Sequence, residues 1–225
     1  MDETTLCIDE ENLLYSSIYE LDQKYIRNSK IKIEYMTKTG DTYNVTLKDW
    51  LSKISDIIKE SGAFVLDSSG SSYIIDEVYD NSLDEIYTLT GKVLGIAFNN
   101  NEKIDIKFSS IIWKLILDKE LELDDMEYFD FDVYEKLKKV KENDVTLMNL
   151  KFVDYYGDEL IKDGENVKVT NENKDEYIEW LLNRIIFNGI NVDQLELVKT
   201  FFEDAVIASK YEDLNVEDIY KLLSE

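Results

Sequence analysis

The chain has 225 residues, of which 44% are hydrophobic and 33% charged, a composition typical of a globular protein with one large or two small domains. Its 49 acidic and 25 basic residues give a net charge of -24, which disfavours binding to nucleic acids and to anionic membranes. With no histidine and one cysteine, Cys7, the sequence excludes intrachain disulfides, Cys/His zinc sites and histidine-based catalytic triads.

The amino-terminal segment is acidic and contains no apolar stretch, so it does not resemble a signal peptide. The apolar run at 111–117 is too short to cross a bilayer. We therefore expect an intracellular, cytoplasmic protein without a metal, cofactor or small-molecule ligand.

The first half of the chain predicts a helix-rich fold with a few short strands. In chain order, we expect an acidic tail over 1–12, a helix over 13–27, a strand over 31–36, a helix between Thr46 and Gly62, a hairpin at 63–66 and 73–75, a helix from a Ser82–Glu85 capping box to Phe98, and a buried helix over 109–117. Gly91 and Gly95 lie one turn apart on the helix ending at Phe98, where they would let another element approach closely.

Beyond residue 119 the predicted elements are shorter and more acidic. They are a helix over 132–142, a strand over 146–153, a turn over 155–158, a long helix capped by Thr170 and ending near Gly189, and helices over 192–208 and 215–223. No repeat or low-complexity tract interrupts the chain. The pattern as a whole predicts a helix-rich α+β fold.

Three segments occur in an order and at a spacing typical of one family. Residues 89–108 contain a helix with two glycines four apart, a loop and the step IDIKF. Residues 111–137 read IIWKLILDKELELDDMEYFDFDVYEKL, and residues 169–181 read VTNENKDEYIEWL at the start of a helix. Together they resemble the HECT domain of ubiquitin ligases, and the resemblance extends over about 14–224.

The resemblance implies a bilobal, N-lobe-like fold. A large helical subdomain would comprise residues 13–118 and 182–225, and a small α/β subdomain would comprise residues 119–181. The family's catalytic cysteine lies in a further, C-terminal lobe, and the similarity here ends at 215–223, where the hinge to that lobe is expected. We therefore expect an N-lobe without the catalytic lobe, and we expect Cys7 to be a bystander thiol because it has no histidine partner.

The resemblance also implies a groove in the small subdomain for a ubiquitin-conjugating enzyme. The positions that match it are Val133 and Leu137 on one helix, Met148 and Leu150 on the following strand, and Tyr177 and Leu181 on the helix after Thr170. Side chains four apart on a helix, or two apart on a strand, share a face, so the three pairs could line one groove. The same spacings also suit an ordinary hydrophobic core, and both interpretations remain open.

Three functions fit the sequence. The chain could bind a conjugating enzyme in the ubiquitin pathway as an adaptor, a decoy or a degenerate ligase. It could instead be a fragment or subunit of an active HECT ligase whose catalytic lobe is encoded elsewhere. It could also be an interaction protein that retains only the fold. We favour the first, with no ligase activity expected from the chain alone.

Overall fold

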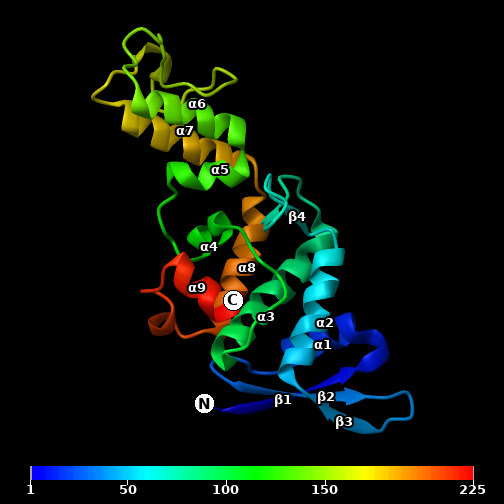
Figure 1. Cartoon of the computed structure of the whole chain (residues 1–225). Coiled ribbons are helices and arrows are strands. Elements are labelled where there is room, and N and C mark those ends of the chain that lie inside the picture. Colours follow the sequence, from blue (N-terminus) through cyan, green and yellow to red (C-terminus); the bar gives the residue numbers. More distant parts are fainter. Residues whose placement is uncertain (1, 225) are drawn as a thin grey trace.

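A helical body and a smaller subdomain at one end of it make up the structure, a computed structural model that describes residues 2–224 (Figure 1). Its helices and strands are, in chain order, β1 Glu3–Asp9, α1 Leu13–Gln23, β2 Lys30–Met36, β3 Thr42–Val45, α2 Leu47–Glu60, β4 Phe64–Leu66, β5 Tyr73–Ile75, α3 Asp84–Asn100, α4 Ser110–Ile116, α5 Met126–Phe129, α6 Phe131–Glu142, α7 Lys174–Asn188, α8 Val192–Ala205 and α9 Val216–Leu223. This is the helix-rich α+β architecture that the sequence predicts. None of these helices combines the length and the apolar character that a membrane crossing requires.

The body is built around the pair α3 and α8, which pack along most of their length. Two glycines of α3 allow this close approach. A Cβ atom at Gly91 would lie 2.4 Å from the backbone oxygen of Val198, and one at Gly95 would lie 2.3 Å from the Cβ of Ala205. Since real side chains do not approach so closely, only glycine fits at both positions, as the sequence predicts.

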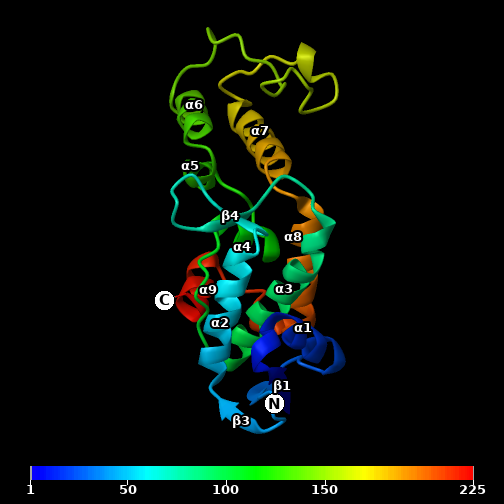
Figure 2. The same cartoon turned by 90° about the vertical axis from the view of Figure 1, so that its right-hand side faces the viewer.

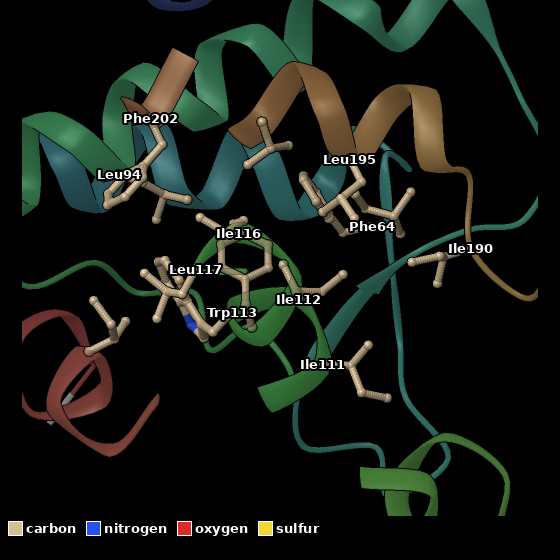
Figure 3. Packing of buried hydrophobic residues seen from close by; sticks show 14 of the residues in the cluster. Phe64, Leu94, Ile111, Ile112, Trp113, Ile116, Leu117, Ile190, Leu195 and Phe202 are labelled. Carbon is tan, nitrogen blue, oxygen red and sulfur yellow. The ribbon is translucent and has the colours of Figure 1, made fainter. Parts of the chain in front are cut away.

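A series of aromatic side chains connects the elements of the core. Phe64 on β4 meets Phe108 with ring centroids 5.0 Å apart, and Phe108 meets Trp113 on α4 at 6.2 Å. Trp113 in turn meets Phe202 on α8 at 6.2 Å (Figure 3). All three pairs are edge-to-face, the arrangement that the quadrupoles of aromatic rings favour.

The expected acidic tail over 1–12 is wrong as a description of residues 3–9, which form β1. This strand pairs in parallel with β2, and β3 completes a three-stranded sheet. Leu6 and Ile8 are fully buried beneath the sheet, while Cys7 between them is exposed. Alternating apolar side chains indicate a strand, but here acidic residues surround them and obscure the pattern.

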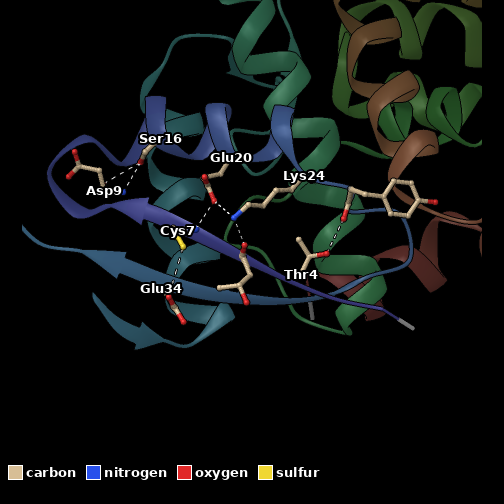
Figure 4. Close-up of polar contacts among 9 residues, drawn as sticks. Thr4, Cys7, Asp9, Ser16, Glu20, Lys24 and Glu34 are labelled. Atoms are coloured by element: carbon tan, nitrogen blue, oxygen red, sulfur yellow. Dashed lines mark hydrogen bonds and ion pairs between the residues drawn. The ribbon is translucent and has the colours of Figure 1, made fainter. Parts of the chain in front are cut away.

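Side chains of α1 and of Lys24, which directly follows it, pair with the backbone along the outer edge of β1 (Figure 4). Glu20 accepts a hydrogen bond from the Cys7 N–H at 2.7 Å, and Lys24 donates to the Thr5 carbonyl at 2.6 Å. Ser16 accepts from the Asp9 N–H at 3.1 Å. Because these groups are already paired, this edge is protected against adding a further strand.

The ends of several elements differ from the predictions. Thr46 caps α2 as expected, accepting a hydrogen bond from the Asp49 N–H at 3.0 Å. The predicted capping box of Ser82 and Glu85 is wrong, because Asp80 accepts from the Ser82 N–H one turn before α3 begins. Similarly, Thr170 lies in the turn that precedes α7 and does not cap that helix.

The predicted strand over 146–153 is also wrong. The segment between α6 and α7 is irregular, and its ladder contacts are two isolated bridges, Lys151 with Lys168 and Val153 with Glu159. This segment lies at the far end of the molecule, beyond α6 and α7 (Figure 2). The subdomain is therefore a helical platform carrying long loops, and α7 runs without interruption past the predicted boundary at residue 181.

Candidate functional site

The candidate site belongs to the small subdomain, whose base is the packed pair α6 and α7. The Asp130 side chain starts α6 by accepting a hydrogen bond from the Val133 N–H at 3.0 Å. The chain then returns through residues 143–173 and enters α7 immediately after Asn173. The loops between the two helices thus lie over the ends of a rigid platform.

Four of the six predicted groove residues are buried in this platform. They are Val133, Leu137, Tyr177 and Leu181. Tyr177 is 5% exposed, and its ring meets the buried ring of Phe152 edge-to-face at 5.6 Å. Burial raises the pKa of the Tyr177 hydroxyl to about 12, with smaller contributions from Tyr155 and Asp154. These four side chains pack in the core and do not line an open groove.

Met148 and Leu150, the other predicted pair, lie in the irregular loop that follows α6. Met148 is 39% exposed at the end of a turn, whereas Leu150 is half-buried against the core. Since no strand forms here, the two side chains do not share a sheet face. The structure therefore does not bring the six predicted residues together on one surface.

The turn that carries Met148 is held by a single carboxylate. Asp144 accepts hydrogen bonds from the Thr146 hydroxyl, from the Thr146 N–H at 2.9 Å and from the Asn171 amide at 2.9 Å. These bonds lower the pKa of Asp144 to about 2. Held in this way, the turn projects Leu147 into solvent, where 97% of the residue is exposed.

A second turn, at 154–158, presents two adjacent tyrosines. Asp154 accepts hydrogen bonds from the Tyr156 and Asp158 N–H groups, each at 2.9 Å. The Tyr155 ring lies under the ammonium group of Lys136 on α6, 5.4 Å from it, and Tyr155 remains half exposed. Tyr156 is 91% exposed.

We call the large exposed apolar side chains of α6 and of the loops that follow it the tip surface. Its members are Phe131, Leu147, Met148, Tyr155 and Tyr156. Only Met148 among them is also a predicted groove residue, because helical and strand spacing detects side chains that face a core. A usable signal was nevertheless present, since large apolar residues in a predicted turn, such as Tyr155 and Tyr156, have no core to face.

The cysteine lies in the body, on a different part of the molecule. Cys7 is exposed on β1, and its Sγ atom lies 3.9 Å from a carboxylate oxygen of Glu34 (Figure 4). Within residues 2–224, no cluster of three or more acidic or cysteine side chains could hold a metal ion. The tip surface itself offers large apolar contacts next to a lysine, which is chemistry for recognising another protein.

The fold and this surface together define a helix-rich α+β protein with exposed apolar side chains on a projecting subdomain. The sequence model of the HECT-domain (ubiquitin-transferase) family matches residues 15–224. The chain therefore belongs to the HECT family, as its motifs predicted. Membership of this family fits a role in the ubiquitin pathway.

Individual relatives are similar over different parts of the chain. The E3 ubiquitin-protein ligase pub3 of Schizosaccharomyces pombe is 35% identical over 127 residues, half of this chain and 16% of the ligase. Nedd-4 of Drosophila melanogaster is 27% identical over 79% of this chain and 19% of its own length. Human HECW2 is 24% identical over 94% of this chain and 15% of its own length. The chain thus spans less than a fifth of each of these ligases.

Proposed function

We propose that this chain binds a ubiquitin-conjugating enzyme through its tip surface. The observation that carries the proposal is the exposure of five large apolar side chains on the subdomain to which the family resemblance assigns docking. Leu147 and Tyr156 lie almost wholly in water, and a partner that covered them would remove this apolar surface from solvent. The four buried groove residues belong to the core of the subdomain that carries this surface.

The chemistry of the tip surface suits a small, transient interface. Tyrosine contributes large contact area at a low cost in conformational entropy, and methionine adapts to partners of different shape. Lys136, whose ammonium group lies over the Tyr155 ring, adds a polar group next to the tip surface. The net charge of -24 speeds the encounter with a basic partner more than it deepens affinity. We expect affinities on the order of micromolar.

The direct test measures binding to a panel of conjugating enzymes by calorimetry or NMR. We expect at least one enzyme to bind. Tyr156→Ala should weaken that binding by about 1–2 kcal/mol, or roughly 5- to 30-fold in Kd. Because Tyr156 is exposed and contributes little to the core, the variant should keep its melting temperature.

Tyr15→Ala provides a matched control, since Tyr15 is an exposed tyrosine on α1, in the body. It should leave binding unchanged. Equal losses for the two variants would show that the tip surface is not the binding site. No interaction with any conjugating enzyme at about millimolar concentration would remove the proposal altogether.

The relatives support a second candidate, a part of an active ligase that works with a catalytic lobe outside these 225 residues. All three relatives are named as E3 ubiquitin-protein ligases, and each is several times longer than this chain. Supplying the catalytic lobe of such a ligase in trans should then speed ubiquitin transfer from the bound conjugating enzyme. Binding without any such acceleration would favour the adaptor or decoy role.

A further inference from the structure

A recess lies on the side of α7 opposite to the buried residues Tyr177 and Leu181. It is a cleft of about 750 Å³ between α7 and the connection that leads from α4 to α5. The α7 residues that line it include Asp175, Ile178, Glu179 and Leu182, which share one face at helical spacing. No residue of the tip surface lines this cleft, so it is separate from the proposed docking site.

The floor and one wall of the cleft are apolar. Leu115 on α4 and Leu121 in the connection are half-buried there, and Leu182 on α7 is buried. Phe187 forms part of the wall and remains partly exposed. An apolar side chain entering the cleft would therefore find surface to bury against.

The rim of the cleft is negatively charged. Two of its lysines are already engaged, since Lys114 pairs with Glu122 at 2.8 Å and Lys119 donates to the Glu212 carbonyl at 2.9 Å. Within residues 2–224 the structure shows ion pairs for two rim acids, and four rim acids have none: Glu120, Asp124, Asp175 and Glu179. Lys141 is the remaining lysine of the rim, so unpaired carboxylates outnumber unpaired cations.

We propose that this cleft binds a short basic segment of a partner protein, one that carries lysine or arginine together with an apolar side chain. The apolar side chain would bury against the floor, and the cations would pair with the free carboxylates at the rim. A second copy of this chain is a poor occupant because its own net charge is -24. A phosphate-bearing ligand would also be repelled, because it too is negatively charged.

The probe for this proposal is a fluorescein-labelled peptide of about ten residues that combines lysines with two leucines. Fluorescence anisotropy at physiological salt should report binding, and a peptide with glutamine in place of each lysine should bind at least about fivefold more weakly. The double variant Asp175→Asn/Glu179→Gln should weaken binding of the lysine peptide about three- to tenfold, as expected for two partly exposed ion pairs. Phe187→Ala should weaken the binding of both peptides.

A matched control separates the local charge from the charge of the whole molecule. Glu77 and Asp213 are exposed acids outside the cleft, and Glu77→Gln/Asp213→Asn removes the same two charges. This variant should bind within about twofold of the natural protein. Equal weakening by the two double variants, equal binding of the two peptides, or no binding at all would overturn the proposal. No conjugating enzyme is needed, so this outcome is independent of the docking experiment.

Discussion

Tyr177, one of the predicted groove residues, packs in the core of the small subdomain. Replacing it with alanine removes the ring that packs on Phe152, and the resulting cavity should lower the free energy of unfolding by about 3–5 kcal/mol. Tyr177→Phe keeps the ring and should change stability by less than about 1.5 kcal/mol. Urea denaturation measures both. A stable Tyr177→Ala variant that loses only partner binding would restore the original interpretation.

The turn that presents Leu147 and Met148 depends on the ionisation of Asp144. Its pKa is about 2 in the folded protein, below the ordinary value of 3.8, because the charged form accepts three hydrogen bonds. The stabilisation is therefore complete above about pH 4 and is lost as the pH falls towards 2. An NMR titration of the Asp144 carboxyl carbon should show this low midpoint.

Thr146→Val is the control for that titration, because it removes one of the donors and should move the midpoint of Asp144 up towards 3.8. A midpoint that stays the same in both proteins would mean that the turn is not held as the structure shows it.

At the scale of elements, the contact between α3 and α8 can be tested with a double-mutant cycle. Gly95→Ala places a methyl group 2.3 Å from the Cβ of Ala205, and overpacking of this kind costs about 1–3 kcal/mol, partly offset by the better helix propensity of alanine. Ala205→Gly removes the opposing atom. The double variant should therefore lose at least about 0.5 kcal/mol less than the sum of the single changes, measured by urea denaturation.

Gly91→Ala serves as the comparison, because its nearest neighbour is the backbone oxygen of Val198, which no side-chain replacement removes. Ala205→Gly should not rescue this variant. A similar rescue of both glycine variants would indicate a general loosening of α8 instead of a specific contact.

Much of this architecture could be predicted, because a long helix with one apolar face has apolar residues three or four positions apart in the sequence. The Thr46 cap of α2 and the close approach at Gly91 and Gly95 follow from residue type alone. The strand β1 was missed because only Leu6 and Ile8 mark it, and its pairing with β2 is a contact distant in sequence. A short strand contains too few side chains for their periodicity to identify it as a strand.

The burial of the predicted groove residues could not be foreseen for a different physical reason. Spacing shows that Val133 and Leu137 share a helix face, but it does not show whether another segment covers that face. Here the loop residue Phe152 packs on Tyr177, and that cover comes from an irregular segment. Conversely, the exposed residues Leu147 and Tyr156 follow no helical or strand period, so periodicity does not identify the tip surface.

At the scale of the whole molecule, the dominant feature is the imbalance of charge. Since 49 acids face 25 bases, many carboxylates cannot have a cationic partner. Most of the ion pairs that do form have at least one well-exposed member, such as Lys32 with Glu3 and Lys38 with Glu11, and exposed pairs of this kind contribute at most about 1 kcal/mol each. Repulsion among the remaining carboxylates therefore opposes the compact state.

Screening by salt should consequently stabilise the protein. Raising KCl from about 10 to about 100 mM shortens the Debye length from roughly 30 to 10 Å, which weakens long-range repulsion more than close ion pairs. Relief of about 1–2 kcal/mol would raise the melting temperature by about 2–8 °C in a chain of this size.

The double variant Glu77→Lys/Asp213→Lys, studied by calorimetry, provides the control. Each replacement adds two positive charges, so the net charge changes from -24 to -20. It should melt higher than the natural protein at low salt and respond less to KCl, whereas a melting temperature that falls with KCl would show that the ion pairs outweigh the repulsion.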